Sequence, residues 1–154
     1  LAGKLDRRDY RVFTLLGDGE LAEGSSWEAA MTAAHYDLDN LVVIVDRNGL
    51  QITGSTEDVN GLEPLVDKFV AFGFAVRSVD GNDIAALVDI LDQPPFETGK
   101  PSLILSNTVK GKGVSFIENA VNWHHHVPTE QEYEIAMAEL DAAAAKLVEE
   151  PQWN

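Results

Sequence analysis

The run Leu-Val-Val-Ile-Val at residues 41–45 constrains the fold more than any other feature of the sequence. A strand without polar alternation must be covered on both faces, as in a parallel sheet with helices on each side. Further β-rich runs lie at residues 10–16, 74–79 and 102–108. Helix-forming segments separate these runs, so the sequence predicts βαβ units, a mostly parallel sheet and a three-layer α/β/α domain.

The segments between the strands carry helix signals, and each predicted helix has its own start signal. These signals are the strong helix formers of residues 20–36, Pro64 in a first turn, Asn82 or Asp83 as a cap, and the capping box of Thr129 with Glu132. Residues 46–61 and 109–127 are predicted to be irregular loops. Large side chains at helical spacing are assigned to the core: Trp27, Met31, Phe69 and Phe72.

Acidic residues dominate the charged positions, with Asp+Glu 26 against Lys+Arg 11 and a formal net charge of -15. Such a surface repels phosphate backbones and anionic lipids, so nucleic acid and membrane surfaces are not expected as partners. The chain has no cysteine, which excludes disulfides, thiolate zinc sites and catalytic thiols. No apolar run approaches the roughly 20 residues of a membrane-spanning helix. We therefore expect a cytoplasmic protein.

The first candidate site is Gly17-Asp18-Gly19, which follows a strand and precedes a helix. Glycines let a backbone turn sharply and approach a ligand, and the helix N-terminus behind them favours an anion such as diphosphate. The carboxylate of Asp18, which we expect to be exposed on the loop, would oppose a phosphate unless a divalent cation lies between them. The alternative is that this tripeptide is an ordinary turn.

The second candidate site is Asp46-Arg47-Asn48-Gly49-Leu50, at the end of the next strand. Asn48 offers a side-chain oxygen and Leu50 a backbone carbonyl, and both are ligands that hard cations accept. Neighbouring strands lie about 4.8 Å apart, so loops that leave adjacent carboxyl ends can share one metal. Asn-Gly is also a favoured turn dipeptide, and the pairing of the two loops across one βαβ unit is what favours a metal site.

The sequence LLGDGELAEGSSWEAAMTAAHYDLDNLVVIVDRNGLQITG, residues 15–54, resembles the thiamine-diphosphate motif of transketolases, in which GDG is followed about thirty residues later by Asn. The resemblance is strongest to the separate N-terminal subunit of two-chain transketolases. It continues through LEPL, FGFAVRSVDGND, TVKGKGVSF and NWHH, and so covers nearly the whole chain. It implies a thiamine-diphosphate-binding domain over residues 1–154. Because relatives carry further residues ahead of LAGKL, we expect this domain to lack its upstream portion.

The resemblance also implies a cofactor and its ligands. Asp18, Asn48 and the carbonyl of Leu50 would hold Mg²⁺ or Ca²⁺, and the metal would hold the diphosphate of thiamine diphosphate. Gly17 and Gly19 would lie against that diphosphate.

A catalytic and cofactor-binding histidine is implied at His124, beside the diphosphate and the substrate. Many relatives have His-Gly here, whereas this chain continues with His125 and His126. The sequence does not decide which of the three imidazoles acts. The alternative for the run as a whole is a solvated loop or adventitious metal binding.

Four other charged residues have two interpretations each. Lys110 and Lys112 either close over phosphate groups or belong to an exposed turn. Glu23 and Glu28 fall where relatives place acidic residues near a contact between subunits. The alternative is that acids early in a helix only favour its dipole.

The implied activity is transfer of a two-carbon ketol unit between sugar phosphates. The pyrimidine-binding domain that completes such a site would belong to a C-terminal transketolase subunit, in a heterotetramer or dimer of heterodimers, and the chain alone would be inactive. Two alternatives stay open. One is a related enzyme, of the deoxyxylulose-phosphate synthase or dihydroxyacetone synthase type. The other is a non-catalytic subunit for interaction only, and the presence of both Asp18 and Asn48 argues against it.

Overall fold

The computed structural model describes residues 1–149. It divides into two compact units, of which the first ends at Thr108 and the second begins at Val109. The first unit contains the sheet and the two candidate loops. None of the helices within residues 1–149 is long and apolar enough to cross a membrane.

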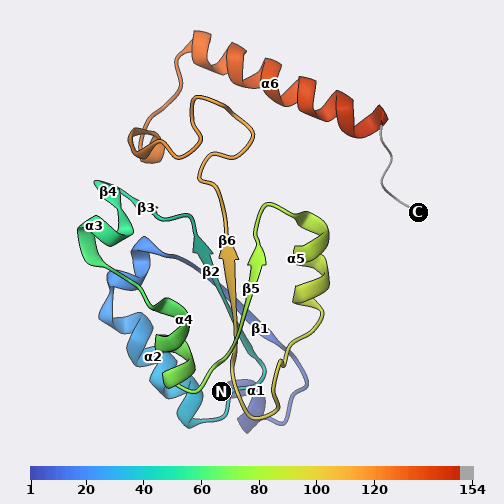
Figure 1. The fold of residues 1–154 in the computed structure, drawn as a ribbon. Coiled ribbons are helices and arrows are strands. Elements are labelled where there is room, and N and C mark those ends of the chain that lie inside the picture. The colour runs from blue at the N-terminus through green and yellow to red at the C-terminus, as the bar shows by residue number, and fades with distance from the viewer. Residues whose placement is uncertain (150–154) are drawn as a thin grey trace. The chain divides into compact units, whose positions relative to one another are not determined.

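The first unit is built on a parallel sheet of four strands in the order β1-β2-β6-β5 (Figure 1). These strands are β1 (Val12–Gly17), β2 (Leu41–Arg47), β5 (Ala75–Asp80) and β6 (Ser102–Asn107). All three pairings are parallel, and in the first of them Gly17 lies opposite Asp46. The four predicted strands are confirmed, and the loops that leave β1 and β2 emerge side by side.

Helices cover the sheet on both faces, which confirms the predicted α/β architecture. On one face Val43 and Val45 of β2 join a core with α2 (Gly24–His35) and α4 (Leu65–Ala71). On the other face Val42 packs with Ile90 of α5 (Ile84–Leu91). Because successive side chains of a strand point to opposite faces, the apolar run of β2 contributes to both cores.

Two predicted segments differ in detail from the structure. The predicted helix after the glycine turn begins as the short 3-10 helix η1 (Gly19–Ala22), and α2 follows it. The segment predicted to be a loop after β2 contains the hairpin of β3 (Leu50–Gln51) and β4 (Gly54–Ser55), followed by α3 (Thr56–Asn60). Its helix signal is a side-chain cap, since the Ser55 hydroxyl accepts from the Asp58 N–H at 3.1 Å.

One member of the predicted core lies outside it. Phe69 is buried, and Trp27 and Phe72 pack against the same core from partly buried positions. Met31, by contrast, is 52% exposed. Ala30 and Ala33 are the buried residues of α2, and Met31 is exposed to solvent.

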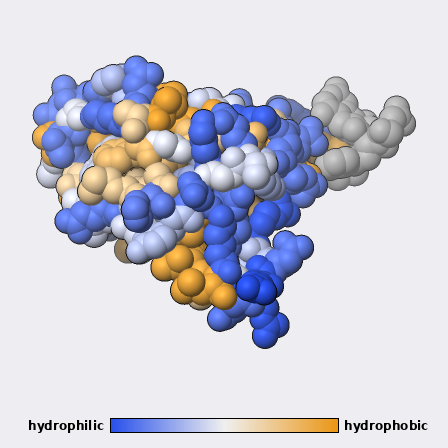
Figure 2. Space-filling model, turned by 90° about the horizontal axis from the view of Figure 1, so that it is seen from below, coloured by the Kyte–Doolittle hydropathy of each residue, from blue (hydrophilic) through white to orange (hydrophobic). Residues whose placement is uncertain are grey.

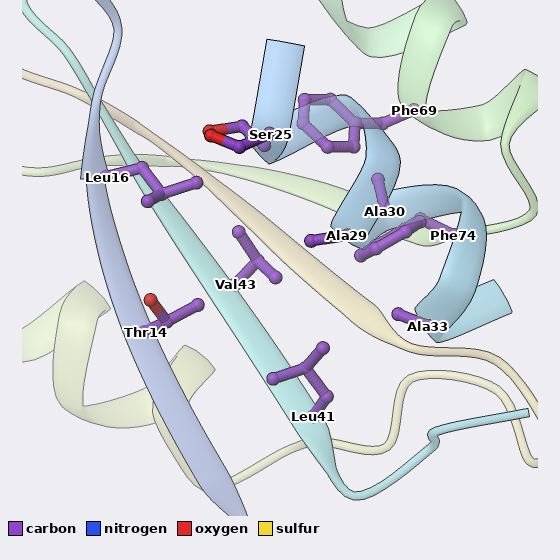
Figure 3. A pocket seen from close by; sticks show the side chains of 11 residues that line it. Thr14, Leu16, Ser25, Ala29, Ala30, Ala33, Leu41, Val43, Phe69 and Phe74 are labelled. Atoms are coloured by element: carbon purple, nitrogen blue, oxygen red, sulfur yellow. The ribbon is translucent and has the colours of Figure 1, made fainter. Parts of the chain in front are cut away.

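A pocket of about 330 Å³ lies between α2 and the first two strands (Figure 3). The pocket is present because the side chains of α2 that line it are small, among them Ala29, Ala30 and Ala33. Phe69 and Phe74 close one side of it. The pocket is apolar apart from hydroxyl groups, including that of Thr14.

Large apolar side chains are exposed along β1, which is an edge strand of the described sheet. Val12, Phe13 and Leu15 are 43%, 46% and 67% exposed. Seen from the end where the strands begin, the surface is mixed, with apolar patches among hydrophilic residues (Figure 2).

The second unit consists of a loop, the 3-10 helix η2 (Val121–His124) and the long helix α6 (Glu130–Glu149). The predicted capping box is confirmed. The Thr129 N–H donates to the Glu132 carboxylate at 2.7 Å, and the Glu132 N–H donates to the Thr129 hydroxyl at 3.3 Å. Ser115 ties the loop to α6 by donating its N–H and hydroxyl to Glu139, each at 2.6 Å.

Candidate functional site

The ends of β1 and β2 form the floor of the candidate site. The Asp18 N–H donates to the Asp46 carbonyl at 3.1 Å, which extends the pairing of the two strands by one residue. The Asp18 side chain is only 1% exposed. The expectation of an exposed loop carboxylate is therefore wrong: the second loop and α3 cover it.

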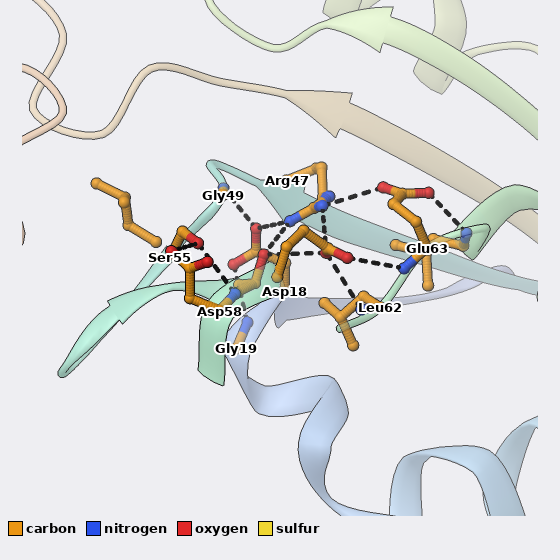
Figure 4. Close-up of polar contacts among 12 residues, drawn as sticks. Asp18, Gly19, Arg47, Gly49, Ser55, Asp58, Leu62 and Glu63 are labelled. Atoms are coloured by element: carbon orange, nitrogen blue, oxygen red, sulfur yellow. Dashed lines mark hydrogen bonds and ion pairs between the residues drawn. The ribbon is translucent and has the colours of Figure 1, made fainter. Parts of the chain in front are cut away.

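Three donors hold the Asp18 carboxylate (Figure 4). Oδ1 accepts from the Gly19 N–H at 2.8 Å. Oδ2 accepts from the Gly49 N–H at 2.6 Å and from the Arg47 guanidinium at 2.9 Å. Burying a carboxylate is costly unless it accepts hydrogen bonds or pairs with a cation. The carboxylate thus joins the first loop to the second.

The second loop turns at Gly49, whose φ of +77° lies in the left-handed region that glycine adopts without strain. Beside it the Asn48 side-chain oxygen accepts from the Leu50 N–H at 3.0 Å. Because Gly49 contacts Asp18 directly, its chain neighbours Asn48 and Leu50 lie in the loop that meets this carboxylate. The structure therefore gathers all three predicted metal ligands, Asp18, Asn48 and Leu50, at one edge of the sheet.

The two glycines that flank Asp18 have different surroundings. A Cβ at Gly17 would meet only the Cβ of Glu20, at 4.0 Å. A Cβ at Gly19 would lie 2.8 Å from the Cβ of Gln51, so only glycine permits this contact between the loops. Gln51 lies on β3, in the segment predicted to be irregular, and sequence reasoning did not assign it to the site.

Sequence reasoning assigned no role to Arg47, although this arginine lies within the second candidate site, directly before Asn48. Its guanidinium is 12% exposed and donates to four side chains (Figure 4). The partners are Asp18 at 2.9 Å, Thr56 at 2.6 Å, and Glu57 and Glu63 at 3.0 Å each. A charged side chain at the end of a buried strand needs polar partners. The position of Arg47 just after the apolar run was therefore a signal that it belongs to the site.

The ion pair between Arg47 and Glu63 is reflected in the pKa values of these two residues. Burial lowers the pKa of Arg47, but the hydrogen bonds and charges of Asp18 and Glu63 outweigh it and raise the pKa overall. The pKa of Glu63 is lowered, first by the Leu65 N–H and then by Arg47. The guanidinium and this carboxylate therefore remain charged around neutral pH.

The donor set fits a hard divalent cation. A carboxylate, a side-chain amide oxygen and a backbone carbonyl are oxygen ligands of the kind that Mg²⁺ and Ca²⁺ take. Within residues 1–149 no three His, Cys, Asp or Glu side chains gather as a metal site. The predicted ligand set is of a different kind, because Asp18 is its single ionisable side chain and the other two ligands are amide and carbonyl oxygens.

His124 belongs to the second unit, at the end of η2, and its ring is exposed. Partial desolvation, the charge of Lys110 and the neighbouring His125 lower its pKa, which favours the neutral ring. His126 differs, because its ring lies 3.3 Å from the Glu132 carboxylate and edge-on to Trp123. Of these two imidazoles, His124 is the one without a carboxylate partner among the described contacts.

The sequence model of the family described as "Transketolase, thiamine diphosphate binding domain" matches residues 3–146. The chain belongs to this transketolase family. This result confirms the resemblance seen in the GDG and Asn48 motifs. It also identifies the four-stranded unit and its loops as part of a thiamine-diphosphate-binding domain.

Relatives and solved structures agree with this family membership. The transketolase domain is 45% identical to one of the subunits of apulose-4-phosphate transketolase from Phocaeicola vulgatus, over 97% of this chain and 53% of the relative. It is 44% identical to the 6-deoxy-6-sulfo-D-fructose transketolase subunit SqwG of a Clostridium species, over 94% of the chain and 53% of the relative. The chain thus spans about half the length of these curated relatives. The crystal structure of Campylobacter jejuni transketolase is similar over 96% of this chain and 28% of the transketolase chain, with a TM-score of 0.72 and 28% sequence identity.

Proposed function

We propose that the chain anchors thiamine diphosphate in a transketolase-type enzyme that transfers a two-carbon ketol unit between sugar phosphates. The observation that carries this proposal is the contact of Asp18 with the Gly49 N–H, between Asn48 and Leu50. Membership in the thiamine-diphosphate-binding family supplies the identity of the cofactor.

In this proposal Asp18, Asn48 and the Leu50 carbonyl hold Mg²⁺ or Ca²⁺, and the cation binds the diphosphate. Gly17 and Gly19 would lie against the same diphosphate, and the space beside Gly17 is open. When bound, thiamine diphosphate supplies a carbanion at its thiazolium ring. The protein provides anchoring and orientation, and the neutral ring of His124 is our candidate for the group beside diphosphate and substrate.

We further propose that a C-terminal transketolase subunit completes the enzyme with a pyrimidine-binding domain, in a heterotetramer or dimer of heterodimers. Two relatives are named as subunits, which supports a two-chain enzyme. The exposed apolar side chains of β1 support burial of this edge against further protein. The absence of cysteine suits a cytoplasmic enzyme.

The substrates are proposed to be sugar phosphates or close analogues. The names of the relatives specify apulose 4-phosphate in one case and 6-deoxy-6-sulfo-D-fructose in another. The donor therefore differs among similar proteins, and a panel of ketoses is needed to identify it for this chain.

Ketol transfer should appear only when the full chain is combined with its partner subunit, thiamine diphosphate and Mg²⁺. The assay follows aldose and ketose products by chromatography, with xylulose 5-phosphate, apulose 4-phosphate and fructose derivatives as donors. A chelator should remove the activity and added Mg²⁺ or Ca²⁺ should restore it. Transfer by this chain alone would contradict the two-subunit proposal, and no transfer from any donor would contradict the enzymatic one.

Replacing Gly19 with alanine should weaken cofactor binding, because its Cβ would collide with Gln51 and separate the two loops. We expect the Kd for thiamine diphosphate, measured by calorimetry with Mg²⁺, to rise by about tenfold, the scale of lost supporting contacts around a metal. Adding Gln51→Gly, which removes the colliding atoms, should recover part of that loss. No recovery would show that the substitution acts by another route.

A further inference from the structure

Arg47 connects the proposed metal site to α3 and the residues after it. Its guanidinium forms ion pairs with Asp18 of the first loop and with Glu57 and Glu63. Thr56, itself 1% exposed, accepts from the same nitrogen that binds Asp18. The arginine is thus held by three acidic side chains and one hydroxyl from separate segments of the chain (Figure 4).

The two carboxylate oxygens of Asp18 accept hydrogen bonds from different donors. Oδ2 accepts from Arg47 and Gly49, whereas the contact at Oδ1 is with the adjacent Gly19 N–H. A carboxylate fixed in this way has one defined orientation in the loop. Side chains that orient metal ligands through hydrogen bonds usually change metal affinity when they are removed.

The positive charge of Arg47, by contrast, acts against metal binding. A cation beside a ligand carboxylate repels a divalent metal, and in a partly buried site this repulsion is not fully screened. Three carboxylates surround the one guanidinium, however, so the cluster as a whole stays negative. Glu57 and Glu63 offset the charge of Arg47 and fix its position at the same time.

We infer that Arg47 is a positioning residue, which holds the Asp18 carboxylate in the orientation that binds the divalent cation. This inference rests on the proposed function, since it assumes that Asp18 is a metal ligand. It assigns to α3 the task of fixing Arg47. It also predicts the sign of the effect: loss of the arginine weakens metal binding, although it removes a positive charge.

The test is titration of the full chain with Mn²⁺ in the presence of thiamine diphosphate, followed by electron paramagnetic resonance of the free ion. Arg47→Met should raise the Kd for Mn²⁺ by about ten- to a hundredfold. Arg47→Lys should lie between this variant and the unaltered protein, because lysine keeps the charge and loses the planar fork. Arg11→Met is the matched control: Arg11 donates to the Leu91 carbonyl at 3.2 Å near the opposite end of β1.

The outcomes separate this inference from the proposed function. If the unaltered protein shows no metal-dependent binding of thiamine diphosphate, both fail. If Asp18→Asn loses the metal but Arg47→Met binds it as tightly as before or more tightly, only the positioning role fails. Circular dichroism at the assay temperature identifies variants that unfold. If Arg47→Met unfolds, Arg47→Lys is the deciding variant. Weaker Mn²⁺ binding by Arg47→Lys then supports the positioning role, and unchanged Mn²⁺ binding overturns it. The variant that combines Asp18→Asn with Arg47→Met should bind no worse than Asp18→Asn alone, since Arg47 acts through Asp18.

Discussion

Replacing Asp18 with alanine is expected to abolish metal-dependent retention of thiamine diphosphate. The substitution removes the one anionic ligand of the proposed set, and neutral oxygens alone hold a divalent cation weakly. We expect the Kd for thiamine diphosphate with Mg²⁺ to rise more than about a hundredfold, beyond the effect of a supporting side chain. Calorimetry on the full chain, with and without Mg²⁺, measures this change directly.

The same substitution should also reduce stability. Asp18 is buried, and without it Arg47 keeps Glu57, Glu63 and Thr56, whereas the Gly49 N–H loses its acceptor. Leaving a buried donor without its acceptor costs about 1–3 kcal/mol. The Asp67→Ala variant is a matched control, since Asp67 is exposed on α4. Unchanged cofactor affinity in Asp18→Ala, or tight binding without any metal, would contradict the proposed site.

The sequence predicted the elements that bring the site together. The apolar run of β2 and the run before it predicted neighbouring parallel strands, and the register of Gly17 opposite Asp46 confirms that pairing. Loops that leave adjacent strand ends must meet, so the proximity of Asp18 to the residues around Gly49 follows from topology alone. Local patterns are sufficient here because the βαβ unit is itself local in the sequence.

The contacts that hold Asp18 were not predictable in the same way. Arg47 reaches Glu57 and Glu63, and their positions depend on a hairpin and a short helix within a segment that reads as a loop. The close approach of Gly19 to Gln51 depends on the same hairpin. Such packing between short elements leaves no periodic signal, because each element has too few residues for a hydrophobic repeat to be recognised.

Packing beneath the site explains the second large effect that we expect. Phe69 is 2% exposed, with ring centroids 5.2 Å from Trp27 and 5.4 Å from Phe74. Trp27 in turn donates to the Leu21 carbonyl at 2.8 Å, and so links this core to η1, which follows the glycine turn. The Phe69→Ala substitution should lower the free energy of unfolding by about 3–5 kcal/mol. The upper end is expected because the new space would join the existing pocket of about 330 Å³.

Urea denaturation of the full chain measures this loss, and Phe13→Ala is its control. Phe13 is 46% exposed on β1, so its replacement should cost about 1 kcal/mol or less. Saturating Mg²⁺ and thiamine diphosphate should raise the stability of Phe69→Ala by about as much as that of the unaltered protein, because a ligand stabilises according to its affinity for the folded state. A much smaller increase would mean that Phe69 also shapes the cofactor site. Equal losses in the two variants would mean that this aromatic cluster does not carry the core.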